Sequence, residues 1–382
     1  MSGDRSGGQV KLVSSLTRSG SSRGQSDSIV NAIRLRLEDA EHRAGGMPIV
    51  YEDLDGGSEE RGSWDAERER ANARYAGADV DVVAYIATLD TDAAPYSIPI
   101  TNQAGPLLQI SPCNTYPGLT RPFAPGEPGI HYPTGVRSYA RTAMTDDLQG
   151  LFAAQWASEL GAKRVAVLHD GEPCGRGVAE PFAESCAALG LELVEPPVAI
   201  VSKQESYRDL ATRTARLAPD LVFYGGIIQN GAGPLWRDVR TELPTATMMG
   251  ADTLFEHAFI VDAGERAEGT LITFGGVPPA LLQGRGREFF ERYVETYGRE
   301  PECYAASAYD AVGAVLAAVE HVGSKNRAAI TRAALATRDF DGLLGRWSFD
   351  SNGDIDLRRA TRLTVRDGDF SFLDVREVPE QS

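Results

Sequence analysis

Cys113 stands in the stretch QISPCNTYPGLT (residues 109–120), where a thiol and hydroxyl groups directly follow an apolar run. Such a thiol could be a nucleophile, because a cysteine at a helix N-terminus has a depressed pKa. A nucleophilic cysteine also needs a partner, usually histidine, and none of the five histidines forms a recognisable Cys/His signature. We therefore favour a turn or a part of a ligand site over a catalytic centre.

Other motifs of catalytic or metal chemistry are weak or missing. The sequence has no P-loop and no GxGxxG fingerprint, so nothing in it supports nucleotide chemistry. The stretch FDSNGD resembles a calcium loop, but counted from Asp350 its glycine is fourth, and Thr361 stands where a bidentate glutamate belongs. A hairpin turn is the preferred interpretation. We expect no metal, no cofactor and no enzymatic activity.

Apolar runs of strand length alternate with helical patterns along the chain, which is typical of α/β proteins. A first series predicts strands at 10–16, 47–53, 79–87 and 105–111, with helices at 29–40, 65–76 and 92–103. A second predicts strands at 164–170, 191–200, 220–226, 245–252 and 269–276, with helices at 146–160, 177–189, 205–217 and 232–241. The last hundred residues add helices at 285–297, 304–321 and 326–337 and a strand-rich tail.

This order of elements predicts two doubly wound lobes, each with a parallel sheet covered by helices. The segment 121–138 is rich in Pro and Gly and is expected to connect the lobes. A chain of 382 residues, 42% hydrophobic and 24% charged, has the composition of a two-domain globular protein. Its net charge of −16 argues against nucleic acid as a partner.

Neither the N-terminus nor the cysteines decide the compartment. MSGDRSGGQ lacks the charged start and apolar core of a signal peptide, so the protein either stays in the cell or was trimmed of a leader. The four cysteines are too widely spaced for a zinc motif or a dense disulfide framework. No apolar stretch approaches the 18 residues of a membrane span.

From about Val10 to Phe372 the chain resembles the type I periplasmic binding proteins, specifically the branched-chain amino acid (Leu/Ile/Val) branch that serves ABC transporters. The resemblance is carried by stretches in the expected order: AIRLRLEDA, YIATLDT, ISPCNTYPGLT, RVAVLHDGEPCGRG, DLVFYGG, MMGAD, YAASAYDAV and GRWSFDSNGD. It implies two α/β lobes joined by a three-strand hinge, with a ligand in the cleft between them. We expect lobe 1 at 9–143 plus 276–340, lobe 2 at 144–275 plus 341–376, and flexible ends at 1–8 and 377–382.

The resemblance also implies a ligand site. In similar proteins two loops of the first lobe bind the α-carboxylate of an amino acid, and those positions fall here on Thr91, Cys113 and Thr115, beside Leu89. The chemistry agrees, because a carboxylate accepts hydrogen bonds and hydroxyl and N–H groups donate them. Capping or turn formation is the structural alternative for both threonines.

On the second lobe the resemblance places Asp252 where the family carries an acid for the ligand ammonium. Capping of the helix that follows is an equally weighted alternative. Asp90 is a complication, because its carboxylate would repel a bound anion unless it faces away or bonds an amine.

The chain departs from the family at the walls of the expected pocket. Tyrosines are common in the family where Cys174 and Ile227 stand here. The first loop offers Arg23 and Gln25 in place of an aromatic wall, and Tyr304 remains a candidate wall. Arg23 could select a second carboxylate, although such arginines are usually solvated. The identity of the ligand therefore cannot be inherited from leucine, isoleucine or valine.

We expect a noncatalytic, monomeric solute-binding protein that captures an amino acid or a similar small zwitterion by cleft closure and delivers it to the permease of an ABC importer. Thr91 and Thr115 are expected on one lobe and Asp252 on the other. The resemblance implies an extracytoplasmic location. A ligand-sensing module of a receptor or regulator is the alternative, and binding of an amide or an aromatic acid is a third possibility.

Overall fold

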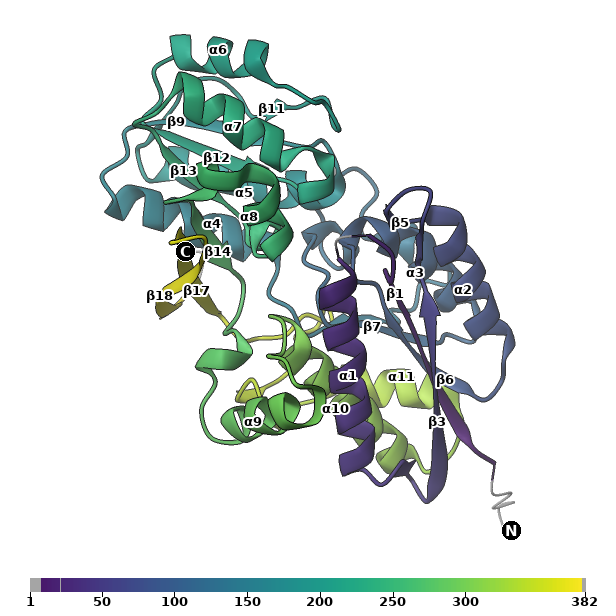
Figure 1. Cartoon of the computed structure of the whole chain (residues 1–382). Helices are drawn as coiled ribbons and strands as arrows, with labels where there is room; N and C mark the ends of the chain where they lie inside the picture. Colours follow the sequence, from purple (N-terminus) through teal and green to yellow (C-terminus); the bar gives the residue numbers. More distant parts are fainter. Residues whose placement is uncertain (1–7, 21, 380–382) are drawn as a thin grey trace. The chain divides into compact units, whose positions relative to one another are not determined.

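The computed structural model describes residues 8–20 and 22–379 (Figure 1). By its internal contacts the chain forms two compact units. Unit 1 contains the residues up to Asn114, Gly118–Ala143 and Pro278–Leu357. Unit 2 contains Thr115–Pro117, Met144–Val277 and the residues from Arg358 onward. Beyond the short excursion at 115–117, the chain therefore passes from one unit to the other three times.

Unit 1 is built on a six-stranded sheet with the strand order β2-β3-β1-β6-β7-β8. All neighbouring strands are parallel except the pair β2 and β3. Every residue of β6 is buried, as expected for a central strand covered on both faces. The strands are β1 (Val10–Leu16), β2 (Arg43–Ala44), β3 (Met47–Asp55), β6 (Val82–Ala87), β7 (Leu108–Ser111) and β8 (Tyr139–Arg141).

Helices cover both faces of this sheet (Figure 1). On one face α1 (Arg23–Asp39), α10 (Ala305–Val322) and α11 (Arg327–Leu335) pack together, and α9 (Arg285–Tyr297) completes the unit. On the other face α2 (Ala66–Ala78) packs against α3 (Ala94–Gln103). Two small hairpins are also present, β4 (Gly57–Ser58) with β5 (Ser63–Trp64) and β15 (Phe340–Asp341) with β16 (Arg346–Trp347).

Unit 2 has an eight-stranded sheet with the order β10-β9-β12-β13-β14-β17-β18, and β11 also pairs with β9. The strands up to β14 are parallel, and β17 and β18 are antiparallel additions. They are β9 (Arg164–His169), β10 (Glu192–Leu193), β11 (Val198–Ala199), β12 (Leu221–Gly225), β13 (Thr247–Gly250), β14 (Leu271–Phe274), β17 (Arg359–Arg366) and β18 (Asp369–Glu377).

Two groups of helices flank the sheet of unit 2. The first is α4 (Asp146–Glu159) with α5 (Pro173–Ala188), and the second is α6 (Arg208–Arg216), α7 (Ala232–Glu242) and α8 (His257–Ala263). The core beside α5 includes the stacked rings of Phe182 and Phe223, whose centroids are 3.9 Å apart. The predicted fold class, two doubly wound lobes with parallel sheets, is confirmed.

Two local predictions were wrong. The strand expected at 191–200 is divided into β10 and β11, because Pro196 and Pro197 lie between them and have no N–H to donate to a sheet. The segment 121–138 does not connect the units but packs inside unit 1. There the Asn102 amide donates to the Val136 carbonyl at 2.7 Å, and the Tyr132 hydroxyl donates to the Leu119 carbonyl at 2.7 Å.

Residues 341–357 belong to unit 1, although they were expected in lobe 2. One of the contacts that hold this segment in unit 1 is a buried ion pair, in which the guanidinium of Arg141 donates to the Asp354 carboxylate at 2.7 Å and both side chains are at most 1% exposed. Asp354 ends the FDSNGD stretch, which forms the predicted turn. The N–H of Asp350 donates to the Asp354 carbonyl at 2.8 Å, closing this turn.

The C-terminal end also differs from the expectation of a flexible tail from 377. Glu377 ends β18, and Val378 is buried beside Phe152 and Ala360. The N–H of Val378 donates to the Arg358 carbonyl at 2.6 Å. Residues 1–7 and 380–382, the remainder of the expected flexible ends, lie outside the described residues.

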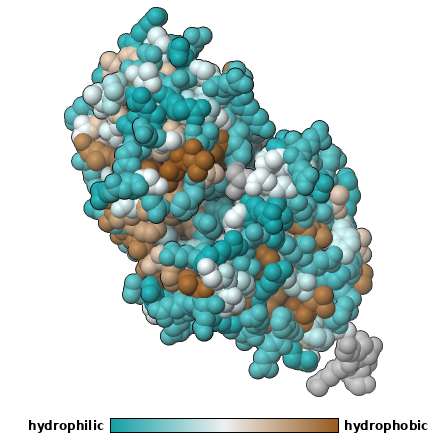
Figure 2. Space-filling view, in the orientation of Figure 1, coloured by the Kyte–Doolittle hydropathy of each residue, from teal (hydrophilic) through white to brown (hydrophobic). Residues whose placement is uncertain are grey.

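The surface in Figure 2 is largely hydrophilic with scattered apolar patches, in keeping with the net charge of −16. Among the helices of the described chain, none combines the length and hydropathy that a membrane crossing requires.

Candidate functional site

The loops that follow β1, β6 and β7 lie along one edge of unit 1, because these strands run parallel. The amide of Asn114 donates to the carbonyls of Thr88 and Leu89 at 3.0 and 3.1 Å, and the hydroxyl of Ser111 donates to the Thr88 carbonyl at 3.0 Å. The hydroxyl of Tyr139 donates to the side-chain oxygen of Asn114 at 3.0 Å. Buried polar side chains thus hold the two loops of the expected anion site together.

Leu89, Thr91 and Cys113 lie together at this edge, and each is at most 7% exposed. Thr91 begins the 3-10 turn Thr91–Ala93 that leads into α3. The thiol of Cys113 donates to the carbonyls of Thr88 and Leu89 at 3.3 and 3.4 Å. Carbonyl acceptors bind the protonated thiol and not the thiolate, so these contacts favour the structural role of Cys113 over a nucleophilic one.

Asp90 is engaged within unit 1, where its carboxylate accepts a hydrogen bond from the hydroxyl of Thr17. Burial raises the pKa of Asp90 above its usual range, and the hydrogen bond from Thr17 opposes that rise. The Asp90 carbonyl also accepts a bond from the hydroxyl of Thr88 at 2.6 Å. Asp90 therefore has protein partners that connect the β1 and β6 loops.

The three remaining candidates of unit 1 differ in their accessibility. Arg23 is the first residue of α1; its side chain is 71% exposed and lies 3.7 Å from the Asp27 carboxylate. Gln25 is buried, and its amide donates to the sulfur of Cys303 at 3.1 Å. Tyr304 follows Cys303, is 5% exposed and precedes α10 directly. Gln25 therefore contacts the residue that directly precedes Tyr304, whereas Arg23 is largely solvated.

Thr115 was expected on the same lobe as Thr91, but it belongs to unit 2. Its carbonyl accepts the N–H of Asp146, the first residue of α4, at 2.9 Å. The next residue, Tyr116, packs so closely on α5 that a methyl group on Gly177 would lie 2.7 Å from its ring. The segment 115–117 is therefore fixed to two helices of unit 2.

The carboxyl ends of β9, β12, β13 and β14 form the corresponding edge of unit 2. Cys174 is the second residue of α5 after β9 and is 6% exposed. Ile227 follows Gly225, which ends β12, and Gly226, and it is half-buried. Asp252 begins the 3-10 turn Asp252–Leu254 after β13 and is 8% exposed. The structure thus brings these three predicted residues to one edge.

Capping of α8 is not the role of Asp252. The residue at the cap position of α8 is Glu256, and the N–H of Phe255 donates to the backbone carbonyl of Asp252 at 2.8 Å. The hydroxyl of Thr253 donates to the Gly226 carbonyl at 2.8 Å, which ties the β13 loop to the β12 loop. The capping alternative weighed for Asp252 is therefore wrong.

Asp170 is a buried residue of this edge that was not among the predicted ligand residues. Its carboxylate accepts the N–H of Glu172 at 3.1 Å, the N–H of Ile227 at 3.0 Å and the amide of Asn230 at 2.9 Å. Burial raises the pKa of Asp170 above 3.8, and the three donors oppose that rise. Burial also lowers the pKa of the neighbouring His169 below 6.5. The position after a strand was the available signal; the contact with the β12 loop was not visible in the sequence.

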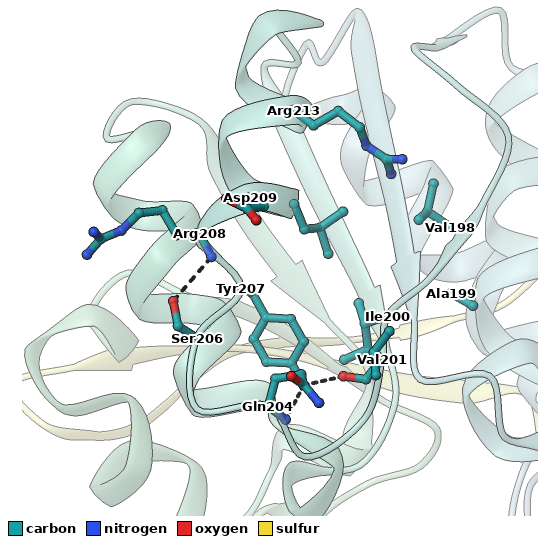
Figure 3. A pocket seen from close by; sticks show the side chains of 11 residues that line it. Val198, Ala199, Ile200, Val201, Gln204, Ser206, Tyr207, Arg208, Asp209 and Arg213 are labelled. Atoms are coloured by element: carbon teal, nitrogen blue, oxygen red, sulfur yellow. Dashed lines mark hydrogen bonds between the residues drawn. The ribbon is translucent and has the colours of Figure 1, made fainter.

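A separate groove of 640 Å³ lies beside β11 and α6 (Figure 3). Ile200 and Tyr207 contribute to its floor, and the guanidinium of Arg213 projects from α6 at its rim. The Tyr207 hydroxyl donates to the Val201 carbonyl at 2.9 Å. A smaller cavity of 180 Å³ in unit 1 is lined by Arg285, Arg292 and Tyr309, among others. None of the predicted ligand residues lines either space.

Within the described residues, no group of three or more His, Cys, Asp or Glu side chains is arranged to hold a metal ion. All four cysteines are buried, and none of them forms a disulfide. Each unit therefore offers hydrogen-bonding and acidic side chains on loops after parallel strands, which can bind the polar ends of a small molecule.

Comparison with known proteins identifies a family whose sequence model matches most of the chain. A family model described as periplasmic binding protein matches residues 9–366. An amino acid binding protein of Pseudomonas aeruginosa is 27% identical over 264 residues, which is 67% of this chain and 64% of that protein. A Leu/Ile/Val-binding protein homolog of Brucella suis is 27% identical over 65% of this chain and 62% of its own length. The matches thus span less than two thirds of these curated relatives.

A solved structure supports the same fold over nearly the whole chain. A leucine-binding protein of Thermotoga maritima covers 96% of this chain and 99% of its own, with a TM-score of 0.84 and 24% identity.

Proposed function

Because this chain belongs to the periplasmic binding protein family, we propose that it is an extracytoplasmic solute-binding protein that captures a small zwitterion for an ABC importer. An amino acid is the first candidate, since relatives in sequence are named for binding amino acids. The protein is proposed to act as a monomer and without catalysis. Permease subunits of the importer are its proposed protein partners.

The observation that carries this proposal is the distribution of chemistry over the two units. Thr91 and the backbone of the Cys113 loop lie at the carboxyl edge of unit 1, and Asp252 lies at the carboxyl edge of unit 2. Hydroxyl and N–H donors suit a carboxylate, and an acid suits an ammonium that would be costly to bury unpaired. We propose that one ligand engages Thr91, Cys113 and Thr115 by its carboxylate and Asp252 by its ammonium.

The residues proposed for the pocket walls differ from those expected for a simple leucine site. Cys174 and Ile227 stand where the family often has tyrosines, and Leu89, Gln25, Arg23 and Tyr304 are the other proposed wall residues. We propose that they contact the ligand side chain. An amide or an aromatic acid is the second candidate.

Thermal-shift screening of the purified protein tests the proposal. The panel contains amino acids, their amides, small acids and hydroxybenzoates, each at millimolar concentration. Stabilisation by one class, confirmed as a saturable isotherm by calorimetry, is the expected result. A flat response to the amino acids together with a clear shift by an acid would replace the first candidate by the second, and a flat response to every compound would contradict both.

A further inference from the structure

Asp170 connects three segments of unit 2 through one carboxylate. One oxygen accepts the N–H of Glu172, directly before α5, and the other accepts the N–H of Ile227 and the side-chain amide of Asn230. The side chain is 5% exposed. The backbone of Asp170 adds a further connection, because its N–H donates to the Gly225 carbonyl at 3.1 Å. The β9 loop and the β12 loop are therefore joined by both the main chain and the side chain of this residue.

The packing around this carboxylate leaves no space for a larger neighbour. A methyl group on Gly175 would lie 2.2 Å from a carboxylate oxygen of Asp170, and one on Gly226 would lie 2.8 Å from its carboxyl carbon. Both distances are far below van der Waals contact. The two glycines therefore let the β9 and β12 loops close directly onto Asp170, so that its position determines theirs.

We propose that Asp170 is a positioning residue of the ligand-binding edge of unit 2, which holds the backbone that carries Cys174 and Ile227 at a fixed spacing. The inference rests on the proposed function in that these two residues are taken as walls of the ligand pocket. Asp170 itself directs its oxygens at protein donors, so its effect on the ligand is transmitted through the two loops.

A carboxylate suits this role better than a neutral side chain. It only accepts hydrogen bonds, and three N–H donors face it here. An asparagine would place its own N–H₂ against at least one of those donors. Burying a carboxylate is unfavourable by itself, as the raised pKa of Asp170 shows, and its donors offset that cost. Without the carboxylate the three N–H donors would lose their acceptor, and the spacing between the β9 and β12 loops would no longer be fixed.

The same sheet provides a control residue that also bridges β9 and β12. Asp220 directly precedes β12, and its carboxylate accepts the N–H groups of Lys163 and Arg164 at 2.9 to 3.2 Å. It therefore joins β9 and β12 as Asp170 does, but at their amino ends. Asp220→Ala removes two backbone hydrogen bonds at the opposite edge of the sheet, where the Asp220 side chain is exposed.

Thiol labelling of the ligand-free protein tests the inference independently of ligand identity. Modification is followed residue by residue by peptide mass spectrometry in wild type, Asp170→Ala and Asp220→Ala. We expect labelling of Cys174 to accelerate about tenfold or more in Asp170→Ala and to stay within about twofold in Asp220→Ala. Cys186, fully buried in the core near the C-terminal end of α5, reports general unfolding and should stay unreactive in all three.

Equal labelling of Cys174 in the two variants would overturn the inference, and so would acceleration of Cys174 and Cys186 in parallel. If Asp170→Ala does not fold, Asp170→Asn and Asn230→Ala replace it. Each removes part of the hydrogen-bond set, and each should give a smaller acceleration at Cys174 alone.

Calorimetry with L-leucine and p-hydroxybenzoate adds the binding readout. For the probe that binds wild type, the affinity should be lower by more than about tenfold in Asp170→Ala and by less than about twofold in Asp220→Ala. Equal losses in both variants would contradict a positioning role. A wild type that binds neither probe counts against these two ligands as candidates, while the labelling result still decides whether Asp170 positions the loops.

Discussion

At the scale of single residues, two acids on the same edge of unit 2 have different environments. The carboxylate of Asp170 accepts three hydrogen bonds from the protein, and its burial raises its pKa. Asp252 lies at the start of a 3-10 turn and does not cap α8. We keep Asp252 as the proposed contact of a ligand ammonium and assign the internal, positioning contact to Asp170.

Replacing Asp252 by alanine should weaken ligand binding by about 2 to 5 kcal/mol, because the ligand ammonium would be buried without its partner. Titration calorimetry with the ligand found in the screen measures this loss, and Asp220→Ala is the control at the far edge of the sheet. Asp252→Asn should lose less, since an amide oxygen still accepts a hydrogen bond. An unchanged dissociation constant in Asp252→Ala would remove this residue from the site.

At the scale of elements, a buried acid on α10 holds the hairpin β15–β16 against this helix within unit 1. The carboxylate of Asp310 accepts the N–H groups of Leu343 and Leu344 at 2.8 and 3.1 Å and the indole N–H of Trp347 at 3.1 Å. Gly342 lies so close that a methyl group there would be 2.1 Å from an Asp310 oxygen. Burial raises the pKa of Asp310 to about 6.

This raised pKa makes the contribution of Asp310 to stability depend on pH. The folded protein holds the proton more tightly than the unfolded chain, so the contribution is full below pH 3.8 and is lost as pH rises through about 6. Between pH 4 and pH 8 the free energy of unfolding of wild type should fall by up to about 3 kcal/mol relative to Asp310→Asn. Urea titrations of both proteins measure the difference; a difference independent of pH would contradict it.

Local sequence patterns were sufficient to predict most elements but not the contacts that cross between them. Strand β6 and helix α9 could be predicted, because an apolar run and a helical spacing of apolar residues are patterns of residues close together in the sequence. The placement of 341–357 depends on Arg141 meeting Asp354, which are more than two hundred residues apart. The hydrogen bonds of Asp170 likewise require knowing that β9 and β12 are neighbours in the sheet.

At the scale of the whole molecule, the expected ligand residues are distributed over both units. Leu89, Thr91 and Cys113 belong to unit 1, and Thr115, Cys174 and Asp252 belong to unit 2. A ligand that contacts both sets favours the state in which both contacts form, through differential binding. One buried thiol in each set provides a reporter for that state.

Saturating ligand should therefore slow the labelling of both Cys113 and Cys174 and raise the melting temperature. Ligand at a hundred times its dissociation constant stabilises the folded protein by about 2.7 kcal/mol. Cys186, fully buried on α5 of unit 2, serves as the internal comparison. Protection of one reporter thiol without the other would indicate that the ligand binds to a single unit.

The division of the chain into interleaved segments has a consequence for biosynthesis. The sheet of unit 1 is complete once Arg141 has been made, yet α10 and α11, which cover one of its faces, follow only after residue 304. The sheet of unit 2 is likewise incomplete until β17 and β18 have been synthesised. Neither unit can therefore complete its core while the ribosome is still synthesising the middle of the protein, because each core includes segments that are made later.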